Sequence, residues 1–272
     1  MPTVGRLRYL EALPQSPRQH GSTRATRTLV LLHAFPLNAQ MWEPQLALAD
    51  DTGWRVIAPH LRGMGGAAGD PPTLSMDDYV GDVIDLLDAL HIEDAVIGGL
   101  SMGGYVALGV FRHASRYFSG MVLADTRSEA DTPEGVEGRK RTLALLREKG
   151  AMAVLDELIP KLLGETTRRD HPEIVERLRE LVRLNSDAAI GGAITALMTR
   201  PDSTPLLSSI HCPTLVLVGE EDTLTPPKLS QGLHQAIAGS ELVLLPAAGH
   251  LSSLEQPQAF NVALARFLTH RV

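Results

Sequence analysis

A serine flanked by glycines is the residue in this chain best placed to act as a nucleophile. Residues 99–104 read Gly-Leu-Ser-Met-Gly-Gly and lie between an apolar run at 95–97 and a helical pattern. A sharp strand-to-helix turn lifts a serine Oγ clear of the backbone, and small residues two positions before and after permit that turn. The helix N-terminus also favours developing negative charge. Ser101 is therefore predicted to be a nucleophile, the alternative being a glycine-rich turn without chemistry.

A serine hydroxyl is a weak nucleophile and needs a base within hydrogen-bond reach. Of the ten histidines, His250 is the best placed, because it follows the apolar run 242–245 and precedes the last helical pattern. A loop at the carboxyl end of a strand lies on the edge where open α/β sheets place their sites. His250 is the predicted base.

The base requires a carboxylate that fixes its tautomer and stabilises the imidazolium. Two aspartates qualify by position. Asp222 follows the apolar run 214–218, and Asp125 follows the run 120–124. Glu220 and Glu221, which precede Asp222, are expected to be solvated.

An acyl-transfer site also needs donors for the oxyanion. The backbone N–H of Met102, directly after the serine, is one candidate. The loop that follows the apolar run 29–32 supplies the other, the N–H of Phe35. His33 in this loop is expected to be structural and to hold the loop through its ring nitrogens.

These residues lie at the ends of short runs rich in Val, Ile and Leu, which are typical of strands buried on both faces. The runs occur at 28–32, 55–58, 94–97, 120–124, 214–218 and 241–245. Amphipathic helical patterns occur at 76–90, 103–112 and 259–268. This alternation predicts a parallel sheet with crossover helices.

Residues 126–199 differ, because they contain several helical patterns and no run of strand type. One helix is predicted to begin at 132–134 and to end at Gly150, and another to follow Asp170. The sequence therefore predicts a helical insertion in the sheet. Residues 9–27, rich in Gln, Ser, Thr and Arg, are predicted to form a surface hairpin or loop.

Charge and composition exclude several classes of function. The 272 residues include 25 basic and 32 acidic ones, for a net charge of -7, which argues against a nucleic-acid partner. The apolar runs are too short to span a bilayer. The basic cluster 139–141 is expected to be a solvated helix face. With one cysteine, Cys212, and no signal-like apolar segment after Arg6 and Arg8, the chain is expected to be cytoplasmic.

Taken together, these motifs resemble the α/β-hydrolase superfamily across essentially the whole chain. Within it the resemblance is to small esterases, enol-lactonases and cofactor-free haloperoxidases. Two positions depart from the pattern: Ala34 stands where a glycine is usual, and His60 where an aspartate is usual. The motifs are His-Ala-Phe at 33–35 followed by Met41-Trp42, Leu-Arg-Gly-x-Gly at 61–65, residues 99–104, Gly219-x-x-Asp222 and Gly249-His250.

The resemblance implies an α/β-hydrolase fold, with a mostly parallel eight-stranded sheet, helices on both faces and an inserted helical cap. It implies a core of residues 1–125 and 200–272 and a cap of residues 126–199. Asp222 is favoured over Asp125 as the acid, because its Gly-x-x-Asp placement and the following Thr225-Pro226 are similar to the family's pattern. Asp125 is expected to support the loop into the insertion. The apolar cap residues either pack cap helices together or line an acyl pocket: Met152, Leu155, Leu158, Ile159 and Leu162.

The expected activity is hydrolysis of small or medium acyl esters, extending to lactones, by Ser101, His250 and Asp222 through an acyl-enzyme, with oxyanion donors at Phe35 and Met102. One alternative is a lactonase acting mainly on acyl-homoserine lactones or enol-lactones. An alternative from another class is a non-catalytic ligand-binding protein of the same fold. No cofactor and no metal are expected, and the expected partner is a small-molecule ester or lactone.

Overall fold

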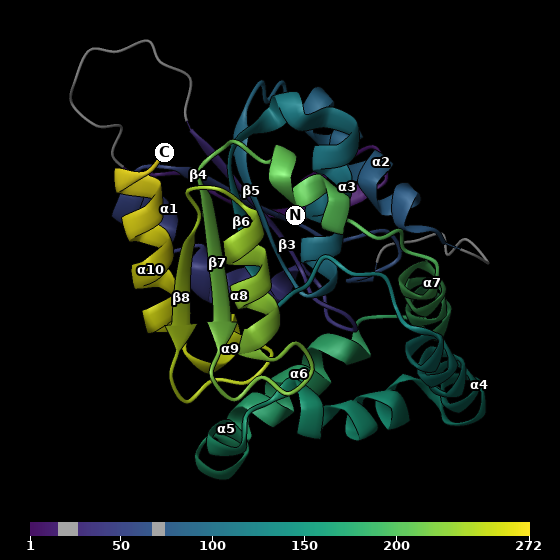
Figure 1. Ribbon diagram of the computed structural model, residues 1–272. Helices are drawn as coiled ribbons and strands as arrows, with labels where there is room; N and C mark the ends of the chain where they lie inside the picture. Colours follow the sequence, from purple (N-terminus) through teal and green to yellow (C-terminus); the bar gives the residue numbers. More distant parts are fainter. Residues whose placement is uncertain (16–26, 67–73) are drawn as a thin grey trace.

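Eight strands form one sheet at the centre of the molecule (Figure 1). The computed structural model describes residues 1–15, 27–66 and 74–272. The strands lie in the order β1-β2-β4-β3-β5-β6-β7-β8; β1 pairs with β2 and β2 with β4 in antiparallel fashion, and all later pairs are parallel. The predicted sheet is confirmed. Its strands are β1 (Thr3–Val4), β2 (Leu7–Ala12), β3 (Thr28–Leu32), β4 (Arg55–Pro59), β5 (Ala95–Leu100), β6 (Phe118–Ala124), β7 (Thr214–Gly219) and β8 (Glu241–Leu245).

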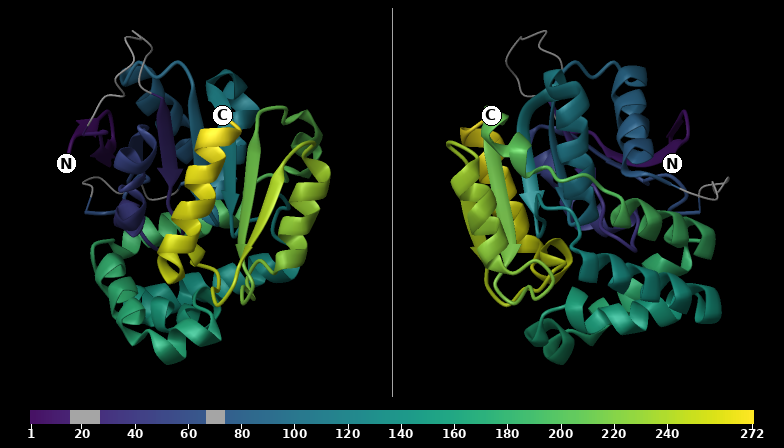
Figure 2. Two further views of the ribbon diagram at one scale, coloured as in Figure 1. Left: turned by 90° about the vertical axis from the view of Figure 1, so that its left-hand side faces the viewer. Right: turned by 45° about the vertical axis from the view of Figure 1, so that its right-hand side comes forward.

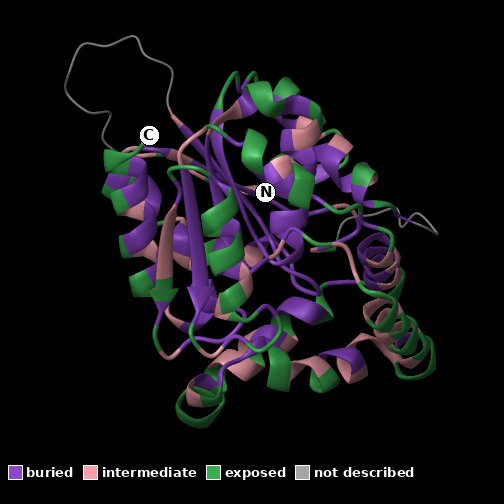
Figure 3. Ribbon diagram, in the orientation of Figure 1, coloured by how far each residue is buried: buried purple, intermediate pink, exposed green. Residues whose placement is uncertain are grey.

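Helices cover both faces of the sheet (Figure 2). On one face α1 (Leu48–Thr52) contacts α10 (Pro257–His270). On the other face α2 (Met76–Ala89) contacts α3 (Met102–Ala114), and α8 (Pro227–Ala236) packs on β7 and β8. Every residue of β3, β5 and β7 is buried (Figure 3), as expected for strands covered on both sides. Short helical turns complete the core: η1 (Ala39–Gln45), η2 (Ser115–Tyr117), η3 (Thr204–Ser209) and α9 (Ser252–Glu255).

Four helices follow one another between β6 and β7, where the sequence predicts an insertion. They are α4 (Pro133–Leu162), α5 (Glu165–Asp170), α6 (Pro172–Arg183) and α7 (Asp187–Met198). In Figures 1 and 2 they lie together beyond the end toward which the arrows of β7 and β8 point. Gly150, the predicted end of the first helix, is a kink with φ 79° and ψ 178°, after which α4 continues.

The prediction of a loop or hairpin from residue 9 onward is wrong at its start. Residues 9–12 belong to β2, which pairs with β4 so that Tyr9 lies opposite Pro59. Leu7 and Tyr9 point into the core and alternate with half-buried residues, the pattern of a strand with one face covered. Residues 16–26, the rest of that predicted loop, lie outside the described residues.

The packing of α3 against β3 generates a prediction about Gly103. A Cβ on Gly103 would lie 2.0 Å from the carbonyl oxygen of Leu32, a backbone atom that cannot move aside. We expect Gly103→Ala to lower the free energy of unfolding by about 3 kcal/mol or to prevent folding. The control is Gly232→Ala in α8, where a Cβ meets nothing within 4 Å; it should raise stability by up to about 1 kcal/mol. Equal urea midpoints for the two variants would contradict this packing.

Candidate active site

Ser101 lies on a sharp turn between the last residue of β5 and the first residue of α3. Its φ of 55° and ψ of -113° fall in a region that side-chain-bearing residues rarely adopt, at a cost of about 1–3 kcal/mol. The surroundings hold it there: its N–H donates to the carbonyl of Ala124 at 2.9 Å, and the Thr126 hydroxyl donates to its carbonyl at 2.9 Å. A Cβ on Gly99 would lie 2.1 Å from the carbonyl carbon of Gly103, so only glycine fits.

The structure brings His250 and Asp222 to this serine. His250 lies in the loop after β8 and Asp222 in the loop after β7, and both are buried. His250 Nε2 is 2.8 Å from the Ser101 Oγ, and Nδ1 is 2.8 Å from Oδ2 of Asp222. An N–H on Nδ1, bonded to the carboxylate, leaves Nε2 as the acceptor for the serine hydroxyl. The three residues predicted as nucleophile, base and acid therefore form one hydrogen-bonded chain.

Asp222 is held as a carboxylate. Its Oδ1 accepts the backbone N–H groups of Leu224 and Thr225 at 2.8 and 2.9 Å, and its Oδ2 accepts the Thr225 hydroxyl at 2.6 Å. Burial opposes ionisation, but the charge of His250 and these hydrogen bonds outweigh it, so the pKa of Asp222 is lowered. Sequence reasoning missed the role of Thr225; its place three residues after an aspartate at a turn is the signal that indicates such a contact.

Asp125, the other candidate acid, makes no hydrogen bond to His250. Its Oδ1 accepts the N–H of Gly219 at 2.8 Å, and its Oδ2 is bonded to the Ser252 hydroxyl. Burial and the nearby charge of Asp222 raise its pKa well above the ordinary value. Asp125 thus joins the end of β7 to the segment after His250. This corrects the expectation that it supports the loop into the insertion.

Phe35 and Met102, the predicted oxyanion donors, line the same cavity as Ser101. Among the described residues neither of their backbone N–H groups donates to a protein acceptor. His33 fixes the first of these loops: its Nδ1 is 3.0 Å from the carbonyl of Ala34, and its Nε2 accepts the N–H of Leu61 at 3.0 Å. Burial lowers its pKa to about 3, so it is neutral and structural, as expected.

The two positions that depart from the family pattern lie beside this loop. Ala34 is fully buried, and its N–H donates to Sδ of Met41 at 3.2 Å. His60 accepts the N–H of Ala39 at 3.3 Å on Nδ1, and burial together with the charge of Arg8 lowers its pKa to about 4. His60 is therefore a neutral packing residue against Gly65, whose Cβ would meet its ring at 1.9 Å.

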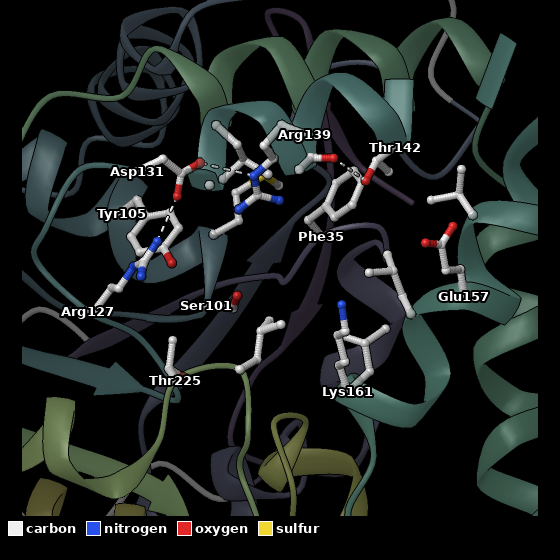
Figure 4. A pocket seen from close by; sticks show the side chains of 18 of the residues that line it. Phe35, Ser101, Tyr105, Arg127, Asp131, Arg139, Thr142, Glu157, Lys161 and Thr225 are labelled. Carbon is white, nitrogen blue, oxygen red and sulfur yellow. Dashed lines mark hydrogen bonds and ion pairs between the residues drawn. The ribbon is translucent and has the colours of Figure 1, made fainter. Parts of the chain in front are cut away.

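A cavity of about 320 Å³ opens above Ser101 (Figure 4). The helical insertion supplies most of its wall, including the apolar side chains of Val154, Leu158 and Leu162 on α4. Two residues of the basic cluster, Arg139 and Arg141, also line it. The prediction that this cluster is a solvated helix face is wrong for Arg139, which is half-buried, whereas Lys140 and Arg141 are exposed as expected. Helix periodicity places Arg139 on the same side of α4 as Gly135, Gly138 and Thr142, which also line the cavity.

Hydrogen bonds tie the loops that carry Asp222 and His250 to the start of α5. Glu221 accepts both the N–H and the hydroxyl of Thr166, at 2.9 and 2.5 Å, so the expectation that it is solvated is wrong. Glu255, buried beside the His250 loop, accepts the N–H groups of Gly164 and Leu251 at 2.8 and 3.0 Å. The insertion is thereby fastened to the loops that place the base and the acid.

Residues 29–263 match the alpha/beta hydrolase family model. The chain is an α/β hydrolase. The comparisons place it among hydrolases of the esterase and enol-lactonase type, as the sequence motifs predict. In the ranges 1–15, 27–66 and 74–272, no cluster of three or more His, Cys, Asp or Glu has the arrangement of metal ligands. No helix in those ranges is long and apolar enough to cross a bilayer.

Three relatives illustrate the similarity of this α/β hydrolase. 3-Oxoadipate enol-lactonase 2 of Acinetobacter baylyi is 31% identical over 87% of this chain and 86% of its own. A thermophilic esterase of Thermogutta terrifontis, with malate bound, superposes with a TM-score of 0.88 at 35% identity, covering 96% of this chain and 92% of its own. The enol-lactonase of Burkholderia xenovorans gives 0.85 at 26% identity, covering 97% and 96%.

The raised pKa of Asp125 predicts how the stability of its amide variant depends on pH. Because the pKa of Asp125 is raised in the folded hydrolase, the folded state keeps a proton that the unfolded chain releases above about pH 4, and stability falls as pH rises. An asparagine at this position binds no titrating proton, so it does not contribute this loss of stability. The stability of Asp125→Asn relative to wild type should therefore increase from pH 4 to 7, by up to about 1.4 kcal/mol per pH unit.

Urea unfolding at pH 4, 5, 6 and 7 measures this difference, with Asp202→Asn as the control. Hydrogen bonds from Thr204 lower the pKa of Asp202, so its stabilisation is lost only as pH falls below about 4. The difference between Asp202→Asn and wild type should stay level from pH 5 to 7. A level difference for Asp125→Asn as well would show that Asp125 is ionised in the folded protein.

Proposed function

We propose that this protein is a serine hydrolase of carboxylic esters and lactones, with Ser101 as nucleophile, His250 as general base and Asp222 as the orienting acid. The observation that carries the proposal is the hydrogen-bonded chain from Ser101 Oγ through His250 to Asp222, with 2.8 Å at each step. The serine lies at a cavity where two backbone N–H groups lack protein acceptors. These are the parts that acyl transfer requires.

In the first half-reaction the Ser101 Oγ bonds to the carbonyl carbon as its proton passes to His250 Nε2. The N–H groups of Phe35 and Met102 stabilise the oxyanion, and Asp222 stabilises the imidazolium. The bond to the leaving oxygen then breaks, and that oxygen takes the proton from Nε2. In the second half-reaction His250 deprotonates a water that attacks the acyl-enzyme, and the bond to Oγ breaks as the serine regains its proton.

We further propose that residues 126–199 act as a cap over a core of residues 1–125 and 200–272. The position of α4–α7 between β6 and β7, and the share of the cavity wall that α4 supplies, support this division. Of the apolar cap residues, Leu158 and Leu162 line the cavity, whereas Leu155 is buried.

Lactone hydrolysis as the main activity is the second candidate, because two similar proteins are named enol-lactonases. A lactone is a cyclic ester and passes through the same intermediates. A panel of p-nitrophenyl esters of increasing acyl length, assayed beside enol-lactones and acyl-homoserine lactones, distinguishes the candidates. We expect turnover of short esters. Turnover confined to lactones would instead establish the second candidate. If Ser101→Ala hydrolysed esters and lactones as fast as wild type, both candidates would be overturned.

The assignment of the acid predicts a large difference between two isosteric variants. Asp222→Asn removes the carboxylate that holds the His250 tautomer, and should lower kcat by roughly 10⁴-fold, as for the corresponding change in another serine hydrolase. Asp125→Asn preserves the bonds to Gly219 and Ser252 and should change kcat less than about threefold. Initial rates on one p-nitrophenyl ester measure both. A larger loss in Asp125→Asn would reverse the assignment.

A further inference from the structure

The cavity wall contributed by residues 126–199 carries more cations than anions. Arg127, Arg139, Arg141 and Lys161 line the cavity, against Asp131 and Glu157. The chain as a whole has the opposite balance, with a net charge of -7. The positive charge is therefore local to this wall.

Asp131 does not neutralise the guanidinium groups around it. Its Oδ1 is 2.7 Å from Arg127 Nη2 and 2.9 Å from Arg200 Nη1, and its Oδ2 is 3.1 Å from Arg139 Nε. Burial opposes its ionisation, but the charges of Arg139 and Arg200 outweigh that effect and lower its pKa. Three positive charges thus surround one carboxylate whose side chain is only 2% exposed.

Two of these cavity-lining arginines keep donors that have no protein acceptor among the described residues. Arg127 bonds Asp131 only through Nη2, and Arg139 only through Nε. Nη1 of Arg127 and both Nη atoms of Arg139 therefore have no acceptor among the described residues, and the Nε of Arg127 is buried without a partner. The two side chains are 25% and 26% exposed, so water reaches them only in part. Partly desolvated cations in excess over anions are costly, and an anion that binds between them removes that cost.

Lys161, an exposed residue of α4, adds a further cation to the cavity wall. Figure 4 shows its amino group directed into the cavity, and no ion-pair partner lies within 4.0 Å of it in the described part of the chain. Glu157, one turn earlier on α4, also faces the cavity in Figure 4 and would repel an anion. A bound anion is therefore expected on the side of Arg127 and Arg139, with Lys161 attracting it as it enters.

We propose that this wall is a subsite for a carboxylate on the substrate, remote from the scissile bond, so that the substrates are esters or lactones that carry a free carboxylate. The inference rests on the proposed function for the position of the scissile bond. A planar carboxylate matches the paired Nη groups of Arg139, and such charge-assisted bonds are about twice as strong as neutral ones. Arg127 and Arg139 bind the carboxylate, and Ser101 attacks the ester carbonyl at the other end of the cavity.

The test compares two isosteric substrates that differ in charge, p-nitrophenyl hydrogen adipate and its neutral amide, p-nitrophenyl 5-carbamoylpentanoate. The spontaneous rate, measured with Ser101→Ala, is subtracted. Wild type should favour the anion in kcat/KM by about tenfold or more, mainly through KM. Arg139→Gln should reduce the preference to about onefold to twofold, and Arg139→Lys should restore part of it.

Two exposed positions on α4 provide variants that leave the packing intact. Lys161→Met should weaken the preference for the anion about threefold, whereas Glu157→Gln, which removes the opposing charge, should strengthen it. A wild-type preference near onefold, or a preference unchanged by Arg139→Gln and Lys161→Met, would overturn the subsite. If the neutral ester is still hydrolysed in a Ser101-dependent way, the proposed function stands and only the subsite fails.

A binding measurement tests the subsite without turnover. Adipate monoamide, an anion, and adipamide, its neutral isostere, are titrated into Ser101→Ala in a calorimeter. We expect the monoamide to bind about tenfold more tightly or better, and this difference to disappear in the double variant with Arg139→Gln. Equal affinities would overturn the subsite, even if wild type hydrolyses neither p-nitrophenyl ester.

Discussion

The active site depends on one close approach of backbone to backbone, where β5 turns into α3. Gly99 packs against Gly103, and Gly103 packs against the carbonyl of Leu32, with no room for a Cβ at either glycine. This contact forces the residue between them into a positive φ and directs its Oγ away from the sheet. Ala124 and Thr126 of the neighbouring segment bond the backbone of Ser101 and hold the strained turn. The glycines therefore matter because they let helix and sheet touch.

The same end of the sheet gathers two buried carboxyl groups with opposite tendencies. Asp222 lies against His250 and receives three further hydrogen bonds, so its charged form is favoured. Asp125 lies deeper and near the charge of Asp222, so its neutral form is favoured. Because two nearby negative charges repel each other, only one of the two carboxyl groups is ionised, and it is Asp222, which contacts the imidazole. The other group becomes a structural tie between Gly219 and Ser252.

The sequence was sufficient to predict the parallel strands, because each is a Val, Ile and Leu run buried on both faces. Positions after such runs also singled out Ser101 and His250, but they left Asp125 and Asp222 as equal candidates for the acid, and only the resemblance to the family favoured Asp222. The strand at 7–12 was missed because its alternating pattern runs into a polar segment of loop composition. The positions of Glu221 and Arg139 were also missed, because each is charged and has an ordinary surface neighbourhood in the chain. Only the packing of the helical insertion against the sheet edge bonds Glu221 to Thr166 and places Arg139 in the cavity wall.

The central claim, that Ser101 is an activated nucleophile, is tested most directly by a serine-directed p-nitrophenyl alkylphosphonate. Its phosphorus resembles the tetrahedral intermediate, and attack by Oγ releases p-nitrophenolate and leaves a stable adduct. We predict one equivalent of p-nitrophenolate per chain and, by peptide mass spectrometry, one modified residue, Ser101, with no adduct in Ser101→Ala. An adduct on another residue, or an unmodified Ser101 in folded protein that still hydrolyses esters, would contradict the mechanism.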